Sequence, residues 1–288
     1  MKILLKSLLI MSVLIGCTPK SMPLTFTLET YPKVDGSTVT IPLSEALAAQ
    51  LTGLTIEEVR PIIHHSKTHE AYLNLINREV DLIFVTYPSV DELKYAQDRL
   101  IELEIVPVVS EAFIFMTHKD NPINSLTLTQ IQDIYQGKIT NWKDVGGEDV
   151  KIIAYQRPEN SGSQTGFYDL VMKDLEVMKP PIEWVQGSMG DIIDAVATYQ
   201  NVPDAIGYSY YYFASDMWIN NQVKLLQVNG ITPNNETIAS GEYPIKTYYY
   251  AVFRKDEKKN SNVRRIVDWL LSDLGQQLAE NFGYVKVK

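Results

Sequence analysis

The stretch 151-KIIAYQRPENSGSQTG-166 places a short apolar strand, a loop of small polar residues and the start of a helix in immediate succession. Small residues in such a loop let the backbone approach a ligand closely, and the first N–H groups of the following helix have no partner within that helix. Ser161, Ser163 and Thr165 add hydroxyl donors, and Arg157 adds a guanidinium that can hold two oxygens at once. The stretch predicts either an oxyanion site or an ordinary helix start beside a surface arginine, and composition does not choose between them.

A second loop of the same kind runs from Asp35 to Pro42 and precedes a predicted helix whose first turn can contain Pro42. It offers the hydroxyls of Ser37 and Thr38. A third strand–helix junction, 66-SKT-68, offers Ser66 and Thr68, and we interpret its lysine as a solvated surface residue. If the first two loops belong to opposite domains, they can close on one anion.

Outward from these loops, β-like runs alternate with helical patterns, which is typical of α/β proteins with a mainly parallel sheet. Strands are predicted at 25–29, 61–65, 81–85, 151–155, 183–185, 205–208 and 248–254. Helices are predicted at 44–51, 70–77, 91–96, 127–135, 165–173, 191–199 and 262–279. Thr127 with Gln130, and Ser188 with Asp191, have the spacing of helix N-caps.

A second α/β unit begins near residue 112, and the C-terminal tail is predicted to return to the first unit. We therefore expect two lobes, one made of 25–111 plus 246–288 and the other of 112–245, with two hinge crossovers and a central cleft. The tyrosines at 210–212 and 248–250 are interpreted either as packing between lobes and strands or as aromatic walls of a ligand site.

The N-terminus has the pattern of a secretory signal. Lys2 and Lys6 precede a short apolar run, which ends at Cys17 in 14-LIGC-17. This pattern resembles a bacterial lipobox, so 1–16 is predicted to be a signal peptide, Cys17 the lipidated residue, and 17–24 a tether. The protein would then be extracytoplasmic and lipid-anchored to the bacterial cell membrane; the alternative is an ordinary signal cleaved elsewhere.

Composition and motifs exclude several functions. Loss of residues 1–16 would change the formal charge of the 288-residue chain from −9 to −11, which argues against a nucleic-acid partner. The single cysteine cannot form an intrachain disulfide. Adjacent His64 and His65 on a strand would face opposite ways, so these and His69 do not predict a metal site. No nucleophile elbow or Walker loop occurs, and neither an enzyme activity nor a cofactor is predicted.

Several stretches resemble the phosphate-binding proteins of bacterial ABC importers, members of the type II periplasmic binding-protein superfamily. The resemblance covers nearly the whole mature chain. Its most specific stretches are 35-DGST-38, 120-DNP-122 through 126-LT-127, 134-IYQGKITNW-142, Arg157 with 161-SGS-163, and 205-AIGY-208.

This resemblance implies a ligand site and a role. In the family, an arginine and a Ser-Gly-Ser/Thr segment four residues later hold the anion, and here Arg157 with Ser161, Gly162 and Ser163 keeps that spacing. The resemblance further implies Ser37 and Thr38 from the first loop and, from the second strand–helix junction, Ser66 or Thr68. Where the family has an aspartate after the third strand, this chain has Thr86, a hydroxyl donor.

The expected function is capture of inorganic phosphate for the membrane permease of an ABC importer, by a monomer. Two alternatives keep the same fold: binding of a different oxyanion, or a sensor or adhesion role without transport.

Overall fold

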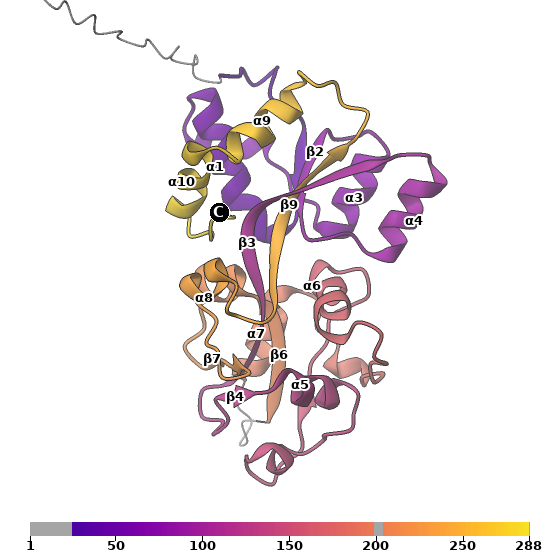
Figure 1. Ribbon diagram of the computed structural model, residues 1–288, viewed down its shortest axis with the longest axis vertical. Coiled ribbons are helices and arrows are strands. Elements are labelled where there is room, and N and C mark those ends of the chain that lie inside the picture. Colours follow the sequence, from indigo (N-terminus) through magenta and orange to yellow (C-terminus); the bar gives the residue numbers. More distant parts are fainter. Residues whose placement is uncertain (1–24, 199–203, 288) are drawn as a thin grey trace, which may run out of the picture.

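Two long strands pass between the two lobes of the molecule and define its architecture (Figure 1). The computed structural model describes residues 25–198 and 204–287. Strand β3 (Leu103–His118) leaves one lobe and β9 (Lys246–Arg254) returns to it. The two strands pair antiparallel, with a register shift between Pro107 and Val109. We call the lobe above the crossing in Figure 1 lobe 1 and the lobe below it lobe 2.

Lobe 1 combines elements from both ends of the described chain. Helix α10 packs against both α9 and α1, so the C-terminal helices cover the first long helix. The elements of lobe 1 are β1 (Val34–Gly36), η1 (Thr38–Thr40), α1 (Ile41–Thr52), α2 (Ile56–Val59), η2 (Arg60–Ile62), α3 (Thr68–Ile76), β2 (Leu82–Val85), α4 (Val90–Asp98), α9 (Asn262–Leu270) and α10 (Asp273–Asn281).

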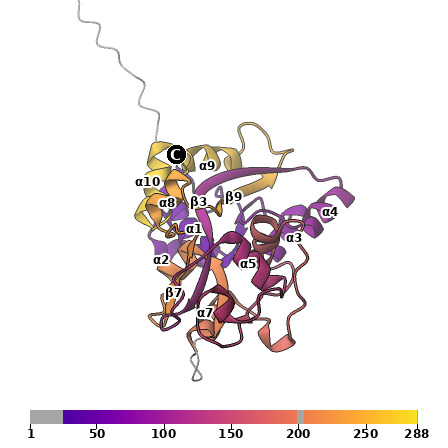
Figure 2. The same ribbon diagram turned by 60° about the horizontal axis from the view of Figure 1, so that its bottom comes forward.

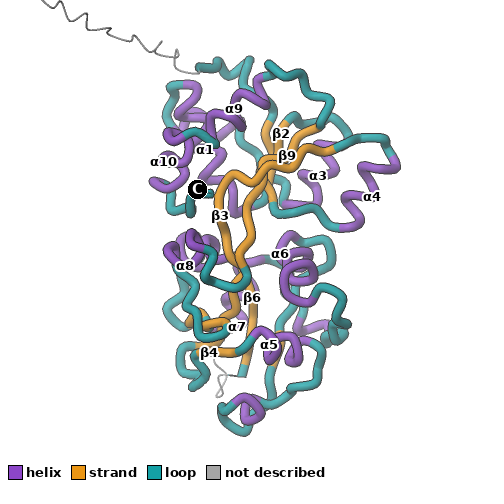
Figure 3. The backbone as a smooth tube through the Cα atoms, in the orientation of Figure 1, coloured by secondary structure: helices purple, strands orange, loops and turns teal. Residues whose placement is uncertain are grey.

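Lobe 2 is the continuous middle of the chain, and Figures 2 and 3 show its helices and loops grouped around the lower ends of the strands. Phe167 stacks on Tyr208 at 4.7 Å between ring centroids, which fixes the helix after the 151–166 stretch against the sheet. The elements of lobe 2 are β4 (Ser125–Leu126), α5 (Leu128–Tyr135), η3 (Trp142–Val145), β5 (Ile153–Ala154), α6 (Gly162–Gly166), η4 (Phe167–Met172), η5 (Ile182–Trp184), α7 (Met189–Ala197), β6 (Ala205–Tyr210), η6 (Phe213–Met217), β7 (Val223–Leu225), β8 (Gln227–Val228) and α8 (Asn235–Ser240).

The main sheet is mixed, and the prediction of a mainly parallel sheet was wrong. Its order is β1-β2-β9-β3-β6-β5, with β7 also paired to β3. Only the two edge pairs, β1–β2 and β5–β6, are parallel. The centre is antiparallel because the chain leaves lobe 1 along one strand and returns along its neighbour. The predicted lobe boundaries at 111/112 and 245/246 lie within β3 and just before β9, the strands that the lobes share.

Most predicted helices are confirmed, and their ends follow the expected caps. Thr127 forms a capping box with Gln130, and the Ser188 side chain accepts from the Asp191 N–H. Pro42 lies in the first turn of α1. The helix predicted at 165–173 begins earlier, at Gly162, because the Ser161 hydroxyl accepts from the Gln164 N–H. The helix predicted at 262–279 is two helices, separated where Ser272 caps α10.

Three predicted strands were wrong, each for a local reason. In 25–29 the hydroxyls of Thr27 and Thr30 bond to nearby backbone groups and hold a turn instead. In 61–65 the chain forms the 3₁₀ turn η2, with Pro61 in its first turn. In 183–185 it forms η5 directly after Pro181. Residues 1–24, including the predicted signal, Cys17 and the tether, lie outside the described residues.

No single helix among residues 25–198 and 204–287 is long and apolar enough to cross a membrane.

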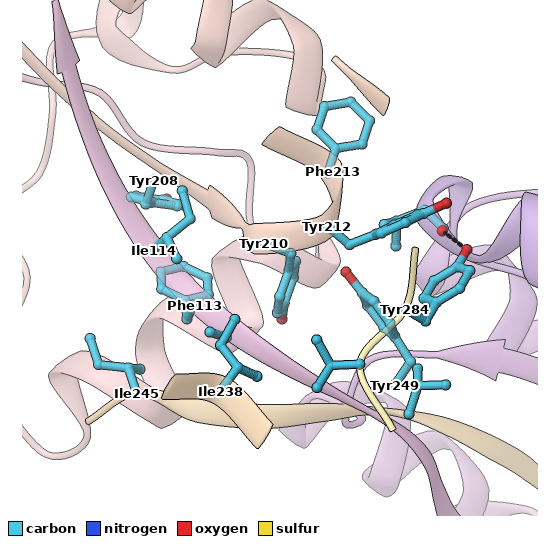
Figure 4. Packing of buried hydrophobic residues seen from close by; sticks show 14 of the residues in the cluster. Phe113, Ile114, Tyr208, Tyr210, Tyr212, Phe213, Ile238, Ile245, Tyr249 and Tyr284 are labelled. Atoms are coloured by element: carbon cyan, nitrogen blue, oxygen red, sulfur yellow. Dashed lines mark hydrogen bonds between the residues drawn. The ribbon is translucent and has the colours of Figure 1, made fainter. Parts of the chain in front are cut away.

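Tyr210, Tyr212 and Tyr249, from the two tyrosine runs, lie in one buried cluster with Tyr284 (Figure 4). The Tyr212 ring of lobe 2 stacks on Tyr284 of the C-terminal tail at 4.0 Å between centroids. Tyr284 donates to the Val39 carbonyl of lobe 1 at 2.7 Å. Tyr210 and Tyr249 also face one another, 5.6 Å between centroids. Tyr212 and Tyr249 follow the packing interpretation of the sequence, whereas Tyr210 packs against Tyr249 and also lines the cavity between the lobes.

Glu111 of β3 is buried in this crossing, where it is 2% exposed. Its carboxylate accepts from the N–H of Ala112 at 2.7 Å and from that of Tyr212 at 3.3 Å. The Tyr249 hydroxyl lies beside the same carboxylate. Burial raises the pKa of Glu111 to about 7, although these hydrogen bonds favour its charged form.

Glu111 should therefore make the protein less stable as the pH rises. The native state holds a proton that the unfolded chain releases at a pKa of 4.5, so the free energy of unfolding should fall between about pH 4.5 and pH 7. The contribution is on the order of 3 kcal/mol. Glu111→Gln cannot titrate and should flatten this part of the profile, measured by urea unfolding at pH 5 and pH 8.

The matched control is Glu242→Gln, at an exposed position of lobe 2, which should keep the wild-type profile. Superimposable profiles for the wild type and Glu111→Gln would contradict the prediction.

Candidate functional site: an anion-binding cleft between the lobes

A cavity of about 810 Å³ opens between the lobes and is lined by residues of both. It brings together all nine side chains or backbone positions that the sequence singled out for a ligand, although they come from five separate segments. These residues are Ser37, Thr38, Ser66, Thr68, Thr86, Arg157, Ser161, Gly162 and Ser163.

The first residues of four helical segments line this cavity. Thr38 begins η1, which leads into α1, and Thr68 begins α3; both belong to lobe 1. Gly162 begins α6 and Met189 begins α7, both in lobe 2. The first N–H groups of a helix have no partner within that helix and carry a partial positive charge. The two lobes therefore present favourable surroundings for an anion from opposite sides.

The Arg157 guanidinium is the cationic centre of the lobe 2 side. Its Nε donates to the Ser163 hydroxyl at 3.3 Å and its Nη1 to the Gln186 carbonyl at 2.8 Å. The part of the chain that the structure describes places no carboxylate within salt-bridge distance of it. Burial lowers the pKa of Arg157 while the nearby Tyr208 and Asp191 act in the opposite direction, and the group remains a cation at neutral pH.

The backbone beneath this guanidinium is held in place by the core of lobe 2. The Arg157 N–H donates to the Tyr208 hydroxyl and to the Gln164 side-chain oxygen, both at 3.0 Å. The Tyr208 hydroxyl in turn donates to that Gln164 oxygen. Sequence analysis did not identify Gln164 and Tyr208 in this role, because only the fold brings them to Arg157.

Thr86 lies at the buried end of the cavity, at the end of β2. It is 3% exposed, and its Oγ1 lies beside the Tyr210 hydroxyl without a well-formed hydrogen bond among the described residues. An unsatisfied buried hydroxyl costs about 1–3 kcal/mol. A ligand oxygen that accepts from Thr86 would remove that cost.

Of the two candidates at the second junction, Thr68 has the hydroxyl that is available. The Ser66 hydroxyl donates to the buried carboxylate of Asp35 at 2.6 Å, and the Ser66 N–H donates to the same carboxylate at 2.7 Å. Asn74 donates to it as well, at 2.8 Å. Ser66 thus lines the cavity but ties the second junction to the first loop. Thr68 lines the same cavity and is 6% exposed.

Gly162 of lobe 2 lies close to two hydroxyls of lobe 1. A Cβ at this position would lie 2.5 Å from the Thr68 hydroxyl and 2.8 Å from the Thr86 hydroxyl. A second contact between the lobes joins the Asn160 side-chain amide to the Asp91 carboxylate at 3.1 Å. The glycine of 161-SGS-163 therefore permits lobe-to-lobe contact at the buried end of the cleft.

The cavity also contains residues that the sequence analysis missed. Its lobe 2 wall includes Gly187, Ser188, Met189, Phe213, Met217 and Trp218. Ser188 was recognised as a helix cap, but no signal in the sequence placed the start of α7 beside Arg157.

The histidines have structural partners in lobe 1. His65 Nδ1 lies 2.7 Å from the Ser37 carbonyl and its Nε2 lies 3.1 Å from the Ser44 hydroxyl. Burial lowers the pKa of His65. His69 pairs with Glu92 at 3.0 Å. Within residues 25–198 and 204–287, no group of three or more His, Cys, Asp or Glu side chains is arranged to hold a metal ion.

The chain has the two-lobed α/β fold of periplasmic binding proteins. The chain belongs to the PBP superfamily, since the family model for the PBP superfamily domain matches residues 30–280.

Two relatives are named phosphate-binding protein PstS. The protein of Borreliella burgdorferi is 30% identical over 183 residues, which are 62% of this chain and 64% of the relative. That of Bacillus subtilis is 28% identical over 169 residues, which are 58% of this chain and 52% of the relative. The chain thus matches less than two thirds of the length of these two relatives.

Solved structures share the fold over most of the chain. A putative phosphate ABC transporter substrate-binding protein with bound phosphate from Clostridium perfringens has a TM-score of 0.68 at 24% identity. An ABC-type phosphate transport receptor from Vibrio cholerae has a TM-score of 0.65 at 21% identity. Each comparison covers 88% of this chain and 98% of the solved one.

Gly162→Ala should hold the lobes apart, because the added methyl meets two hydroxyls of lobe 1. We expect a larger radius of gyration by small-angle X-ray scattering in the variant than in the wild type. Each lobe should keep its structure, so the thermal midpoint should move by only a few degrees.

The matched control is Gly187→Ala in the same cavity, where the nearest atom to the added methyl is an Asp191 oxygen at 3.4 Å. An identical radius for both variants would contradict the prediction.

Proposed function

We propose that this protein captures inorganic phosphate outside the cytoplasm and delivers it to the membrane permease of an ABC importer. The observation that carries the proposal is the Arg157 guanidinium, which faces the interlobe cavity with hydrogen-bond partners but no carboxylate among the described residues. A charge of this kind, surrounded by helix starts and hydroxyls, is suited to an oxyanion. Relatives named phosphate-binding protein PstS support phosphate as that anion.

The proposed contacts come from both lobes. Arg157, Ser161, Ser163 and the N–H of Gly162 donate from lobe 2. From lobe 1 the donors are Ser37, Thr38, Thr68 and Thr86. Ser66 acts through Asp35 and positions the second junction against the first loop. The bound anion holds the two lobes together through donors from both, and the closed form is the state that docks on the permease.

The protein performs no chemistry on its ligand in this proposal. It acts as a monomer, and Cys17 carries the lipid that anchors it to the outer face of the cell membrane. The strongly acidic body is compatible with anion capture because the attraction is local, arising from Arg157, the exposed Lys67 of the cavity wall and backbone dipoles.

Calorimetric titration tests the ligand. The mature protein, stripped of phosphate, should bind phosphate saturably with one site at pH 6 and pH 8, and its affinity for sulfate is measured in the same way. Equal affinity for both anions would mean that the protein binds small oxyanions in general and is not specific for phosphate. Absence of saturable binding to either would reject the proposal and favour a sensor or adhesion role.

Arg157→Ala should weaken phosphate binding by at least about 2 kcal/mol, or roughly thirtyfold, because it removes a charged donor from a partly buried site. The control is Arg60→Ala, which removes an arginine paired with Glu45 at the surface of lobe 1 and should leave the affinity unchanged. Circular dichroism checks that both variants fold. A change below tenfold in folded Arg157→Ala would remove Arg157 from the site.

A further inference from the structure

The cavity is much larger than the anion proposed for it. Inorganic phosphate has five non-hydrogen atoms and fills the space of a few water molecules, at about 30 Å³ each. A cavity of about 810 Å³ lies within the range of sites that hold whole organic ligands. The lobes already meet at Gly162, so the space is not due to a cleft that is open at its buried end.

The extra space continues along one wall of lobe 2. Arg157 donates to the carbonyl of Gln186, and the chain then runs through Gly187 and Ser188 into Met189 at the start of α7. The next residue, Gly190, lies against Trp218, since a Cβ there would be 3.0 Å from the indole ring. The segment 186–190 therefore contacts the Arg157 guanidinium at its first residue and the Trp218 ring at its last.

The far part of this wall is apolar and held in a fixed orientation. The Trp218 N–H donates to the Asp194 carboxylate at 3.1 Å, and its ring lies parallel to the Phe213 ring, tilted by 10° at 6.2 Å. Trp218 is nevertheless 45% exposed. Met189 and Met217 line the same space with side chains that adapt to different shapes. An exposed but immobilised indole is a surface on which an organic group can pack.

The donors of the site also favour a ligand whose oxygens carry no proton. The carboxylates that line the cavity, Glu70 and Glu159, belong to exposed residues and not to the buried end at Thr86. In the described chain, the donors at that end are hydroxyls, N–H groups and a guanidinium, which suit oxygens without protons. A phosphate monoester is a dianion above its second pKa of about 6, and its fourth oxygen carries the organic group.

We propose that the cleft also takes phosphate monoesters, with the phosphoryl group at Arg157 and Ser163 and the organic group against Met189 and Trp218. This inference rests on the proposed function, since it uses the same phosphoryl site. It extends the ligand class from inorganic phosphate to esters with a flat or apolar substituent.

Competition calorimetry with phenyl phosphate tests the inference. Phenyl phosphate should bind at least as tightly as inorganic phosphate, compete with it for one site, and bind far more tightly than phenol. Binding of inorganic phosphate with phenyl phosphate more than about a hundredfold weaker would overturn the inference and leave the proposed function intact. Absence of binding by either would overturn both.

Variants of the wall locate the organic group. Trp218→Ala should weaken phenyl phosphate by about tenfold and change the affinity for inorganic phosphate by less than about twofold. Asp194→Ala, which frees the indole, should give a smaller loss in the same direction. The control is Trp184→Ala, a tryptophan of lobe 2 that does not line the cavity, which should change neither affinity.

Equal losses for both ligands in Trp218→Ala, or no loss for either, would overturn the placement. If Trp218→Ala fails to fold, Trp218→Leu serves in its place, since it keeps an apolar side chain while removing the aromatic face. The same outcomes decide the question in that variant.

Discussion

A guanidinium without a carboxylate partner, placed between two lobes, is the feature on which the rest of this cleft depends. Salt bridges elsewhere in lobe 1 pair arginines with acids, as Arg264 does with Glu104. Arg157 instead bonds to a hydroxyl and a carbonyl, and no carboxylate of the described chain lies within salt-bridge distance of it. The Tyr208 and Gln164 contacts hold its backbone, and four helix starts line the same cavity. Such an arrangement is stable with an anion present and costs free energy without one.

The sequence predicted which residues line the cleft better than it predicted the directions of the strands. Loops such as 35-DGST-38 and 161-SGS-163 act through their own backbone and hydroxyls, which are visible residue by residue. Strand direction in the centre depends on where distant parts of the chain return, as in the pairing of Ala112 with Lys246. Short strands such as 25–29 were predicted from composition, but local hydroxyl bonds overrode it.

Within the site, the sequence predicted donors but not their partners. Ser66 has the residue type for a ligand contact, yet Asp35 uses its hydroxyl. Trp218 reaches the cavity only because Gly190 leaves room for the indole and Asp194 holds its N–H. Each of these contacts joins residues far apart in the chain, so no local pattern indicates them. The tyrosine runs show the same limit, because their periodicity fits a wall and a lobe contact equally well.

Strands β3 and β9 cross from lobe to lobe without an intervening loop, and they pair along the crossing. A hinge built from a loop turns about one or two backbone dihedrals at little cost. Here any opening must instead be spread over several paired residues as added twist and bend, so that the hydrogen bonds between the strands persist. The crossing therefore has elastic stiffness, and the buried Glu111 and the stacked Tyr212 and Tyr284 rings add to it. The paired strands resist bending, so the two lobes have one preferred angle and return to it once the ligand has left.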